Sequence, residues 1–332
     1  MTAASLPNAQ APSVTFVVIA YNESLGIVNC LNSVLAQRGG YSYKVIVVDD
    51  GSTDGTGDLV RRTFGERVDV ITQENLGRGA ARMTGLKAVK TELVAMVDSD
   101  IILPADWLQR CTEYMGPASA VGGIADPDGD CSTIQRIFAL TSKLKQGSTA
   151  ITGNNSLFIT EHLLSLGASW MTPLGEDFRL TQLLFARGRI VKTVPGLVVR
   201  HVEHKTYLQS LKWLYKSGED ATKLLFEFRI FRKPDLVFLS FLFLLVAASA
   251  GVSTFGVLVF IPLLVFLGLI GFAHLYSKFE FSTRKFEFLM GVIPNSILMA
   301  AYLLGRTIGL LQSLFSLLSR PERVAKNREL TP

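Results

Sequence analysis

Short apolar runs alternate with amphipathic stretches over the first hundred residues of the chain. The apolar runs have the length of strands and fall at residues 14–20, 44–48, 68–72 and 92–97. The stretches between them have helical periodicity and fall at 24–36, 56–64 and 79–89. Strands that are apolar throughout and alternate with helices predict an α/β fold, with a mostly parallel sheet covered by helices on both faces.

Polar residues follow each predicted strand. The four segments read "YNES", "DDGSTDGT", "QENLGRG" and "DSD". Because ligands bind beyond the carboxyl ends of strands in such sheets, these segments predict one polar crevice. Asp98 and Asp100 in the last segment are hard oxygen ligands suited to Mg²⁺ or Mn²⁺ bridging to a diphosphate. A lone D-x-D is a weak signal, since acidic residues also cap the helix that follows.

The pattern changes in the last third of the chain. Residues 236–273 contain no Asp, Glu, Lys, Arg or His, which is long for one membrane helix of about 20 residues and predicts a helical hairpin at about 235–276. A buried core helix is the alternative. Basic residues flank both ends of this stretch, so we expect both ends and the preceding domain on the cytoplasmic side of a cell membrane, as a multi-pass protein. The N-terminus has neither a charged n-region nor an apolar h-region, so no secretory signal is expected.

Residues 286–319 allow two interpretations. The run is apolar enough to span, but Pro294 and Asn295 interrupt it and Arg306 follows. From about Ala300 onward polar and apolar residues lie on opposite sides, as in an interfacial helix. A third span would also place the basic tail, residues 320–332, outside. We therefore favour an interfacial or re-entrant segment over a spanning one.

The domain organisation follows from these patterns. Residues 1–12 are expected to be a flexible N-terminus, 13–228 a cytoplasmic domain, and 229–319 a membrane region. The net charge of +5 lies partly in the membrane flanks and the tail, so it favours an anionic lipid surface over nucleic acid. Three cysteines without a C-x-x-C pair fit a reducing compartment better than a disulfide framework or a zinc site.

Five motifs carry a resemblance to a known family. They read, in chain order, "AYNES", "VVDDGSTDGT", "NLGRGAARMTGL", "DSD" and "GED". Their order and spacing resemble the motifs of family 2 glycosyltransferases with the GT-A fold, over roughly residues 13–220. The resemblance implies transfer of a sugar from a UDP- or GDP-linked donor, with inversion at the anomeric carbon. It implies Asp100 as the ligand of a divalent cation, Mn²⁺ or Mg²⁺. It also implies a nucleotide site made of Tyr21, Glu23, Asp50, Asp98 and Arg82, with Arg82 near the diphosphate.

The chemistry supports these roles. Breaking a sugar–phosphate bond leaves a nucleoside diphosphate whose developing charge must be neutralised, and a divalent cation does this as a Lewis acid. Arg78 and Arg82 lie four residues apart on one helical face, so an exposed basic face is the alternative for both.

The resemblance extends to an acceptor half. In "GEDFRL", Asp177 matches the family's catalytic base and Glu176 is expected to support or contact the acceptor. An inverting displacement needs one carboxylate beside the acceptor hydroxyl to take its proton. The alternative is a helix N-terminus, where acids are favoured in the first turn.

A later segment is similar to the family's Q-x-x-R-W signature. Its three positions are Gln209, Lys212 and Trp213, which we expect to bind the acceptor side of the reaction. Lysine in place of arginine is a departure, because it removes the planar two-pronged donor. The alternative is an amphipathic helix that leads to the membrane. Nearby, His201 and His204 form a poor zinc signature, and we expect at most one of them to touch substrate.

Three functions compete on the sequence alone. The favoured one is a membrane-anchored inverting glycosyltransferase that takes a nucleotide-sugar donor and extends a lipid-linked saccharide or growing polysaccharide. A polyprenyl-phosphate sugar synthase would use the same donor site with a bare lipid phosphate. The third is a non-catalytic membrane scaffold or transporter with a degenerate donor site. The presence of Asp50, Asp100 and Asp177 argues against the third.

Overall fold

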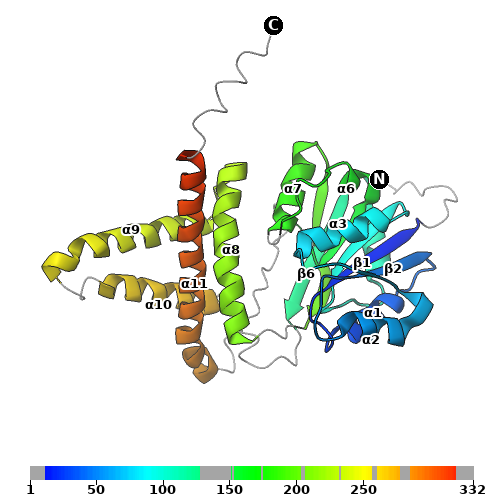
Figure 1. Cartoon of the computed structure of the whole chain (residues 1–332), viewed down its shortest axis with the longest axis horizontal. Coiled ribbons are helices and arrows are strands. Elements are labelled where there is room, and N and C mark those ends of the chain that lie inside the picture. Colours follow the sequence, from blue (N-terminus) through cyan, green and yellow to red (C-terminus); the bar gives the residue numbers. More distant parts are fainter. Residues whose placement is uncertain are drawn as a thin grey trace, which may run out of the picture. The chain divides into compact units, whose positions relative to one another are not determined.

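The computed structural model describes residues 12–127, 151, 153–172, 175–202, 206–231, 233–255, 260–276 and 285–318. These residues form two compact units (Figure 1). The described residues up to 202 make up the N-terminal unit, and those from 206 onward make up the C-terminal unit.

An eight-stranded sheet with the order β3-β2-β1-β4-β7-β6-β8-β5 forms the N-terminal unit. Parallel pairing joins β1 to β2 and β4, β2 to β3, and β6 to β8. Strand β7 is antiparallel to β4 and β6, and β5 is antiparallel to β8. The strands are β1 (Val14–Ala20), β2 (Tyr43–Asp49), β3 (Asp69–Thr72), β4 (Leu93–Asp98), β5 (Ile101–Ile102), β6 (Ala120–Pro127), β7 (Asn155–Ile159) and β8 (Val191–His201).

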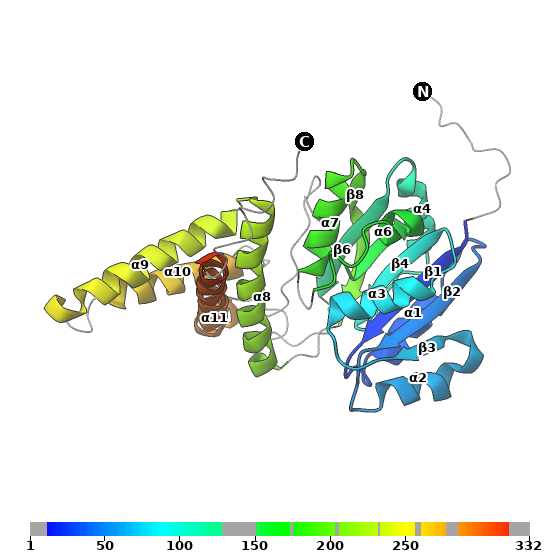
Figure 2. The same cartoon turned by 45° about the horizontal axis from the view of Figure 1, so that its top comes forward.

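Helices cover both faces of this sheet, because alternate residues of each strand point to opposite sides. On β1, Phe16 packs into one apolar cluster with α1, α2 and α4, whereas Val17 packs into a second cluster with α3, α6 and α7. Figure 2 shows these helices around the strands. The helices are α1 (Ile27–Leu35), α2 (Thr56–Phe64), α3 (Arg78–Ala88), α4 (Trp107–Met115), α6 (Thr160–Leu164) and α7 (Glu176–Ala186), with a 3₁₀ turn η1 (Gly65–Arg67).

The predicted α/β fold is confirmed. The first four predicted strands each lie within one residue of the observed bounds, and α2 has the predicted bounds. Near-continuous burial along β1 and the last five residues of β2 explains why their sequences are apolar on both faces.

Four helices form the C-terminal unit. They are α8 (Tyr207–Phe228), α9 (Lys233–Phe255), α10 (Ile261–Tyr276) and α11 (Lys285–Leu318). The predicted helical pair at 235–276 is present as α9 and α10, which we call the hairpin. The contacts group α8 with the C-terminal helices, whereas the sequence placed residues up to 228 in the preceding domain. The functional boundary therefore stays a prediction.

Helix length limits the membrane topology. Of the helices in the described part of the chain, α11 alone is long and apolar enough to cross a membrane, over Val292–Ser316. The described apolar parts of the hairpin, Pro234–Ala250 and Ile261–Ala273, are shorter. The expected multi-pass arrangement is thus not supported, because two of the three apolar segments fall short of the length of a span.

The glycine at position 85 lets α3 lie close against the sheet. A Cβ atom at Gly85 would overlap a methyl group of Val17 and lie 3.1 Å from a methyl group of Val48. These two valines belong to the packed core beneath α3, so the space is not available without a shift of helix or strand.

We therefore predict that Gly85→Ala lowers the free energy of unfolding by about 1–3 kcal/mol, although alanine is the better helix former. Urea unfolding followed by the fluorescence of the buried Trp107 and Trp170 measures this. The control is Thr84→Ala, one residue away on the same helix, which should change stability by less than about 0.5 kcal/mol. Equal stability of the two variants would contradict the packing argument.

Candidate functional site

The acidic residues singled out in the sequence lie at the carboxyl ends of adjacent strands. Tyr21 follows β1, Asp50 follows β2, and Asp98 ends β4. Since β1 lies between β2 and β4, these three strand ends are neighbours at the point where the strand order reverses. Such a switch point is where open α/β sheets bind their ligands.

Asp50 holds the loop that leads into α3. Its Oδ1 accepts hydrogen bonds from Gln73 Nε2 at 2.6 Å and from the Leu76 backbone N–H at 3.0 Å, and its Oδ2 accepts from the Gly77 N–H at 2.9 Å. Gly51 has a φ of 79°, and a Cβ there would lie 2.8 Å from the Asn75 nitrogen. The close approach of the two loops thus requires glycine. The expected contact of Asp50 with a base stays a prediction, because this carboxylate already accepts three hydrogen bonds.

Arg82 joins the donor and acceptor motifs through its two terminal nitrogens. Nη2 donates to Asp98 Oδ1 at 2.6 Å, and Nη1 donates to Glu176 Oε1. The Arg82 side chain is 3% exposed and that of Glu176 is 2% exposed, so this ion pair is shielded from water. We expected Arg82 near the diphosphate. In the structure a diphosphate would have to compete with two carboxylates for its guanidinium group.

Glu176 and Asp177 begin α7, where the helix dipole favours acidic side chains. Burial raises the pKa of Asp177, and the neighbouring Glu176 raises it further against the lowering effect of Arg78 and Arg82. Burial acts to raise the pKa of Glu176 as well, but the same two arginines hold that pKa below its ordinary value. The environment therefore separates the two adjacent carboxyls into a stable anion and a better proton acceptor.

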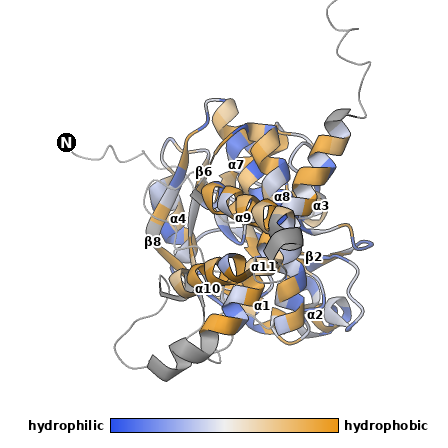
Figure 3. Cartoon of the chain, turned by 90° about the vertical axis from the view of Figure 1, so that its left-hand side faces the viewer, coloured by the Kyte–Doolittle hydropathy of each residue, from blue (hydrophilic) through white to orange (hydrophobic). Residues whose placement is uncertain are grey.

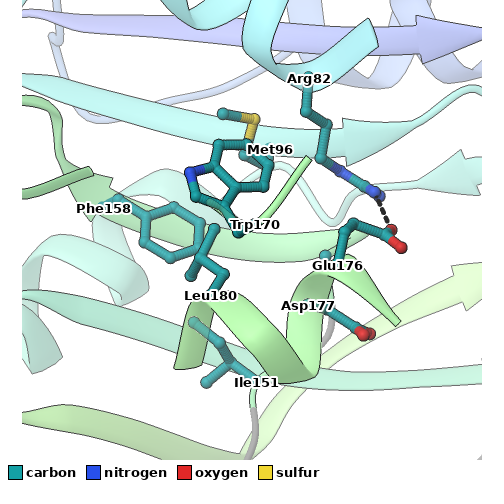
Figure 4. Close-up of a pocket in the computed structure, with 9 residues that line it drawn as sticks. Arg82, Met96, Ile151, Phe158, Trp170, Glu176, Asp177 and Leu180 are labelled. Carbon is teal, nitrogen blue, oxygen red and sulfur yellow. Dashed lines mark hydrogen bonds and ion pairs between the residues drawn. The ribbon is translucent and has the colours of Figure 1, made fainter. Parts of the chain in front are cut away.

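Asp177 and Glu176 lie at the edge of a small cavity with apolar walls (Figure 4). Figure 4 shows the ion pair of Arg82 with Glu176, and Asp177 beside them. The apolar part of the lining comes from Met96, Ile151, Phe158, Trp170 and Leu180. A carboxylate in such surroundings is poorly solvated, which accounts for the direction of its pKa shift.

Asp100 pairs with a histidine from the far end of the sheet. His201 Nε2 lies 2.9 Å from Asp100 Oδ2, and the Asp100 carbonyl accepts from the Val202 N–H at 2.8 Å. Carboxylate and imidazole are both ligands of Mn²⁺-type cations. Among the described residues no group of three or more His, Cys, Asp or Glu side chains could hold a metal ion. The pair fits a cation that takes its remaining ligands from phosphate and water.

Other predicted site residues have varied surroundings. Tyr21 is exposed, and the Glu23 N–H donates to Thr56 Oγ1 at 2.9 Å. Gln209 belongs to the C-terminal unit and closes a capping box at the start of α8, where its Oε1 accepts from the Thr206 N–H at 2.7 Å. On the same helix Lys212 is exposed and Trp213 is half-buried. The acceptor roles of Gln209, Lys212 and Trp213 stay predictions, and His204 lies outside the described residues.

The sequence did not reveal two of these contacts. The pairing of His201 with Asp100 joins residues that are far apart in the chain, and only the presence of a histidine near the end of a strand hinted at it. Arg78 Nε lies 3.5 Å from Glu176 Oε1, so Arg78 and Arg82 do face the site together. The spacing of four residues between the two arginines indicated a shared helical face, but it did not identify the carboxylates that they contact.

The fold places these strand ends at the switch point of an α/β sheet, and comparisons with known proteins show what the domain resembles. A family model described as glycosyl transferase family 2 matches residues 15–164, slightly less than half of the chain. This match agrees with the family that the motifs predicted.

Two curated relatives agree with this assignment. The succinoglycan biosynthesis protein ExoO of Rhizobium meliloti is 41% identical over 112 residues, which is 33% of this chain and 32% of that protein. The uncharacterized glycosyltransferase YaiP of Escherichia coli is 30% identical over 214 residues, which is 58% of this chain and 52% of that protein. The matches thus span between a third and about half of the length of these relatives.

A solved structure shares the fold. The mannosyltransferase PcManGT from Pyrobaculum calidifontis, in complex with GDP-Man and Mn²⁺, aligns with a TM-score of 0.56 at 20% identity. The alignment covers 88% of this chain and 86% of that one. This similarity confirms the predicted fold class.

The buried position of Arg82 generates a prediction about stability. Arg82→Met leaves Asp98 and Glu176 without their shared cation, and we expect a loss of about 3–5 kcal/mol in the free energy of unfolding. Burial already raises the pKa of Asp98 against the effect of Arg82. Without Arg82, the pKa of Asp98 should rise further above its unfolded value, while Arg78 still acts to lower the pKa of Glu176. The folded state then binds more protons, so the loss should be larger at pH 8 than at pH 5.

Urea unfolding at the two pH values tests this expectation. Arg61→Met is the control, because Arg61 and its partner Asp58 are both exposed and the loss of their ion pair should cost less than about 1 kcal/mol. A pH-independent loss in Arg82→Met would mean that the missing packing of the side chain, rather than its charge, destabilises the variant.

Proposed function

We propose that this protein is an inverting glycosyltransferase that moves a sugar from a UDP- or GDP-linked donor to a saccharide carried on a lipid or a growing polysaccharide. The observation that carries the proposal is the linkage of Asp98 to Glu176 through Arg82, with Asp177 next in the chain. This linkage brings a donor motif and an acceptor motif to one end of the sheet. A scaffold with a degenerate site would have no need to bury and balance these charges.

The donor side of the proposal rests on the strand ends. Asp50 orders the loop that begins α3, and Tyr21 and Glu23 lie on the neighbouring strand end, where a nucleoside can be bound. Asp100 and His201 would hold a divalent cation, Mn²⁺ or Mg²⁺, which when bound neutralises the charge of the departing diphosphate. The GDP-Man and Mn²⁺ in the complex of the structural neighbour support this choice of ligands.

The acceptor side rests on Asp177. Its carboxylate would accept the proton of the acceptor hydroxyl as that oxygen attacks the anomeric carbon from the side opposite the diphosphate. A raised pKa makes Asp177 a better proton acceptor than an exposed aspartate. Glu176 stays ionised beside two arginines and fixes the position of α7, so the two neighbouring acids have different tasks.

The acceptor class is proposed from the relatives and the C-terminal unit. The name of ExoO places that relative in the biosynthesis of a polysaccharide. The apolar helices of the C-terminal unit favour an acceptor that is presented at a membrane, and we place the enzyme at the cytoplasmic membrane face.

We predict that Asp177→Asn lowers kcat by about 10²- to 10⁴-fold, the usual contribution of a general base, while nucleotide binding changes by less than about threefold. Transfer from a panel of UDP- and GDP-sugars, with calorimetric binding of UDP and GDP, measures both quantities. Asp58→Asn is the matched control, because Asp58 also lies in the first turn of a helix but is exposed. Activity of Asp177→Asn within tenfold of the parent would exclude Asp177 as the base.

A second prediction concerns the cation. Asp100→Asn and His201→Gln should each weaken the Mn²⁺-dependent binding of UDP or GDP by about tenfold or more, the usual effect of altering a ligand or its support. Binding measured in the presence of a chelator should stay at the parent level, because the nucleoside contacts are elsewhere. If the variants and the parent gain equally from Mn²⁺, the cation is not held by Asp100 and His201.

A further inference from the structure

The C-terminal unit has its helices arranged as successive layers of decreasing polarity. Figures 1 and 2 show α8 on one side of α11 and the hairpin extending from the other side. Helix α8 carries Lys212, Lys216, Glu219, Asp220 and Lys223, whereas residues 236–273 of the hairpin carry no ionisable group. Helix α11 lies between the charged layer and the apolar layer.

Helices α8 and α11 run parallel in close contact. The Tyr207 hydroxyl donates to the Pro294 carbonyl at 3.0 Å, and Thr222 Oγ1 donates to the Arg306 carbonyl at 3.0 Å. Glycines let the two backbones meet between these points, since a Cβ at Gly305 would overlap the carbonyl of Tyr215. Helix α8 therefore covers α11 from Pro294 to at least Arg306, which is about half of the candidate span Val292–Ser316.

This contact decides how α11 can lie in a membrane. If α11 crossed the bilayer, its middle near Arg306 would lie at the midplane, and Lys216 and Lys223 of α8 would lie there with it. The Lys216 side chain is 63% exposed, and the ion pairs of Lys216 and Lys223 with Glu219 would face hydrocarbon. An unpaired lysine at the centre of a bilayer costs about 2.5–3.5 kcal/mol, and pairing with one carboxylate reduces this cost without removing it. A surface position of α11 avoids this cost.

The buried arginine of α11 that faces the hairpin forms an ion pair with an aspartate. Arg306 is fully buried and bonds to Asp235 at the start of α9, and its Cζ lies 4.6 Å from the centroid of the Phe238 ring. The sequence pattern placed Arg306 on the polar side of an interfacial helix, whereas in the structure Arg306 is buried against Asp235. The predicted opposite face is exposed, with Leu304, Leu311 and Phe315 among its residues.

The hairpin itself has no polar side. Figure 3 shows α9 and α10 in the colours of hydrophobic residues along their described parts. Exposed apolar side chains project from both helices, among them Phe243 at 72% and Leu264 at 66% exposure. Water is an unfavourable surrounding for an apolar surface of this extent. The apolar part of α9, Pro234–Ala250, is about 25 Å long, so it can reach deep into a hydrocarbon core of about 30 Å without crossing it.

We propose that the hairpin enters a lipid bilayer and returns to the same face, while α11 lies in the plane of the membrane surface with α8 above it in the headgroup region. The single described helix that has the length of a span is then the one that does not span. The occupant of the apolar surface is lipid, because no side chain of the hairpin between 236 and 273 offers a charge to a polar partner. This assignment does not depend on the chemistry proposed for Asp177.

Depth measurements on the full chain test the proposal. Single cysteines at Val246, Leu304 and Lys216 would carry an environment-sensitive fluorophore in vesicles of phosphatidylethanolamine and phosphatidylglycerol. Cys131 is replaced by serine in every variant, and the parent chain with this replacement, in which Cys30 and Cys111 are buried, gives the background. We expect the label at 246 to be quenched best by deep acyl-chain nitroxides, the label at 304 by shallow ones, and the label at 216 by aqueous iodide.

Two other outcomes would overturn the proposal. Deepest quenching at 304 would show that α11 spans, and aqueous quenching at 246 would show that the hairpin binds something other than lipid. A second test is Val246→Lys, which should weaken vesicle flotation by about tenfold or more, against Leu25→Lys at an 81% exposed position of the N-terminal unit as control. These readouts need no sugar donor, so they can fail while the proposed sugar transfer holds, and the reverse.

Discussion

One guanidinium group balances a buried and a partly buried carboxylate in the N-terminal unit. Arg82 of α3 binds Asp98 at the end of β4 and Glu176 at the start of α7. Burying three charges is favourable only when their hydrogen bonds are satisfied together, so α3, β4 and α7 must keep these positions. The position of Asp177 follows from this constraint, because it is the next residue of the same helix turn. The site is therefore a consequence of how the fold satisfies its buried charges.

The sequence predicted the first four strands and the helices between them, because buried parallel strands are apolar throughout and leave a clear pattern. It did not predict β5 to β8. It also placed Asp50, Asp98 and Asp100 at strand ends, since those ends are where the apolar runs stop. It could not predict the partners of Arg82 or the contact of His201 with Asp100. Such contacts join residues far apart in the chain, and they depend on how β7 and β8 enter the sheet rather than on any local period.

Composition identified the hairpin but misled on α11. A one-dimensional pattern assigns an arginine to the polar side of a helix, whereas three-dimensional packing can bring an aspartate to it. Arg306 and Asp235 are such a pair, and their burial takes Arg306 out of the predicted polar side, whereas Gln312 and Ser316 of that side stay exposed. The length of an apolar helix likewise takes no account of the charged helix α8 that packs along α11.

The two buried arginines differ in what they are needed for. Arg82 belongs to a site whose proposed chemistry requires charged groups, so apolar residues could not replace its network without removing the site. Nothing in the proposed chemistry requires Arg306, and a buried ion pair often stabilises no more than apolar packing of the same volume. The ion pair of Arg306 and Asp235 must then act by selecting one packing arrangement of the C-terminal helices. Asp235 of α9 accepts a hydrogen bond from Arg306 of α11, and Thr222 of α8 contacts the same arginine. These contacts fix the register of α8, α9 and α11 against one another.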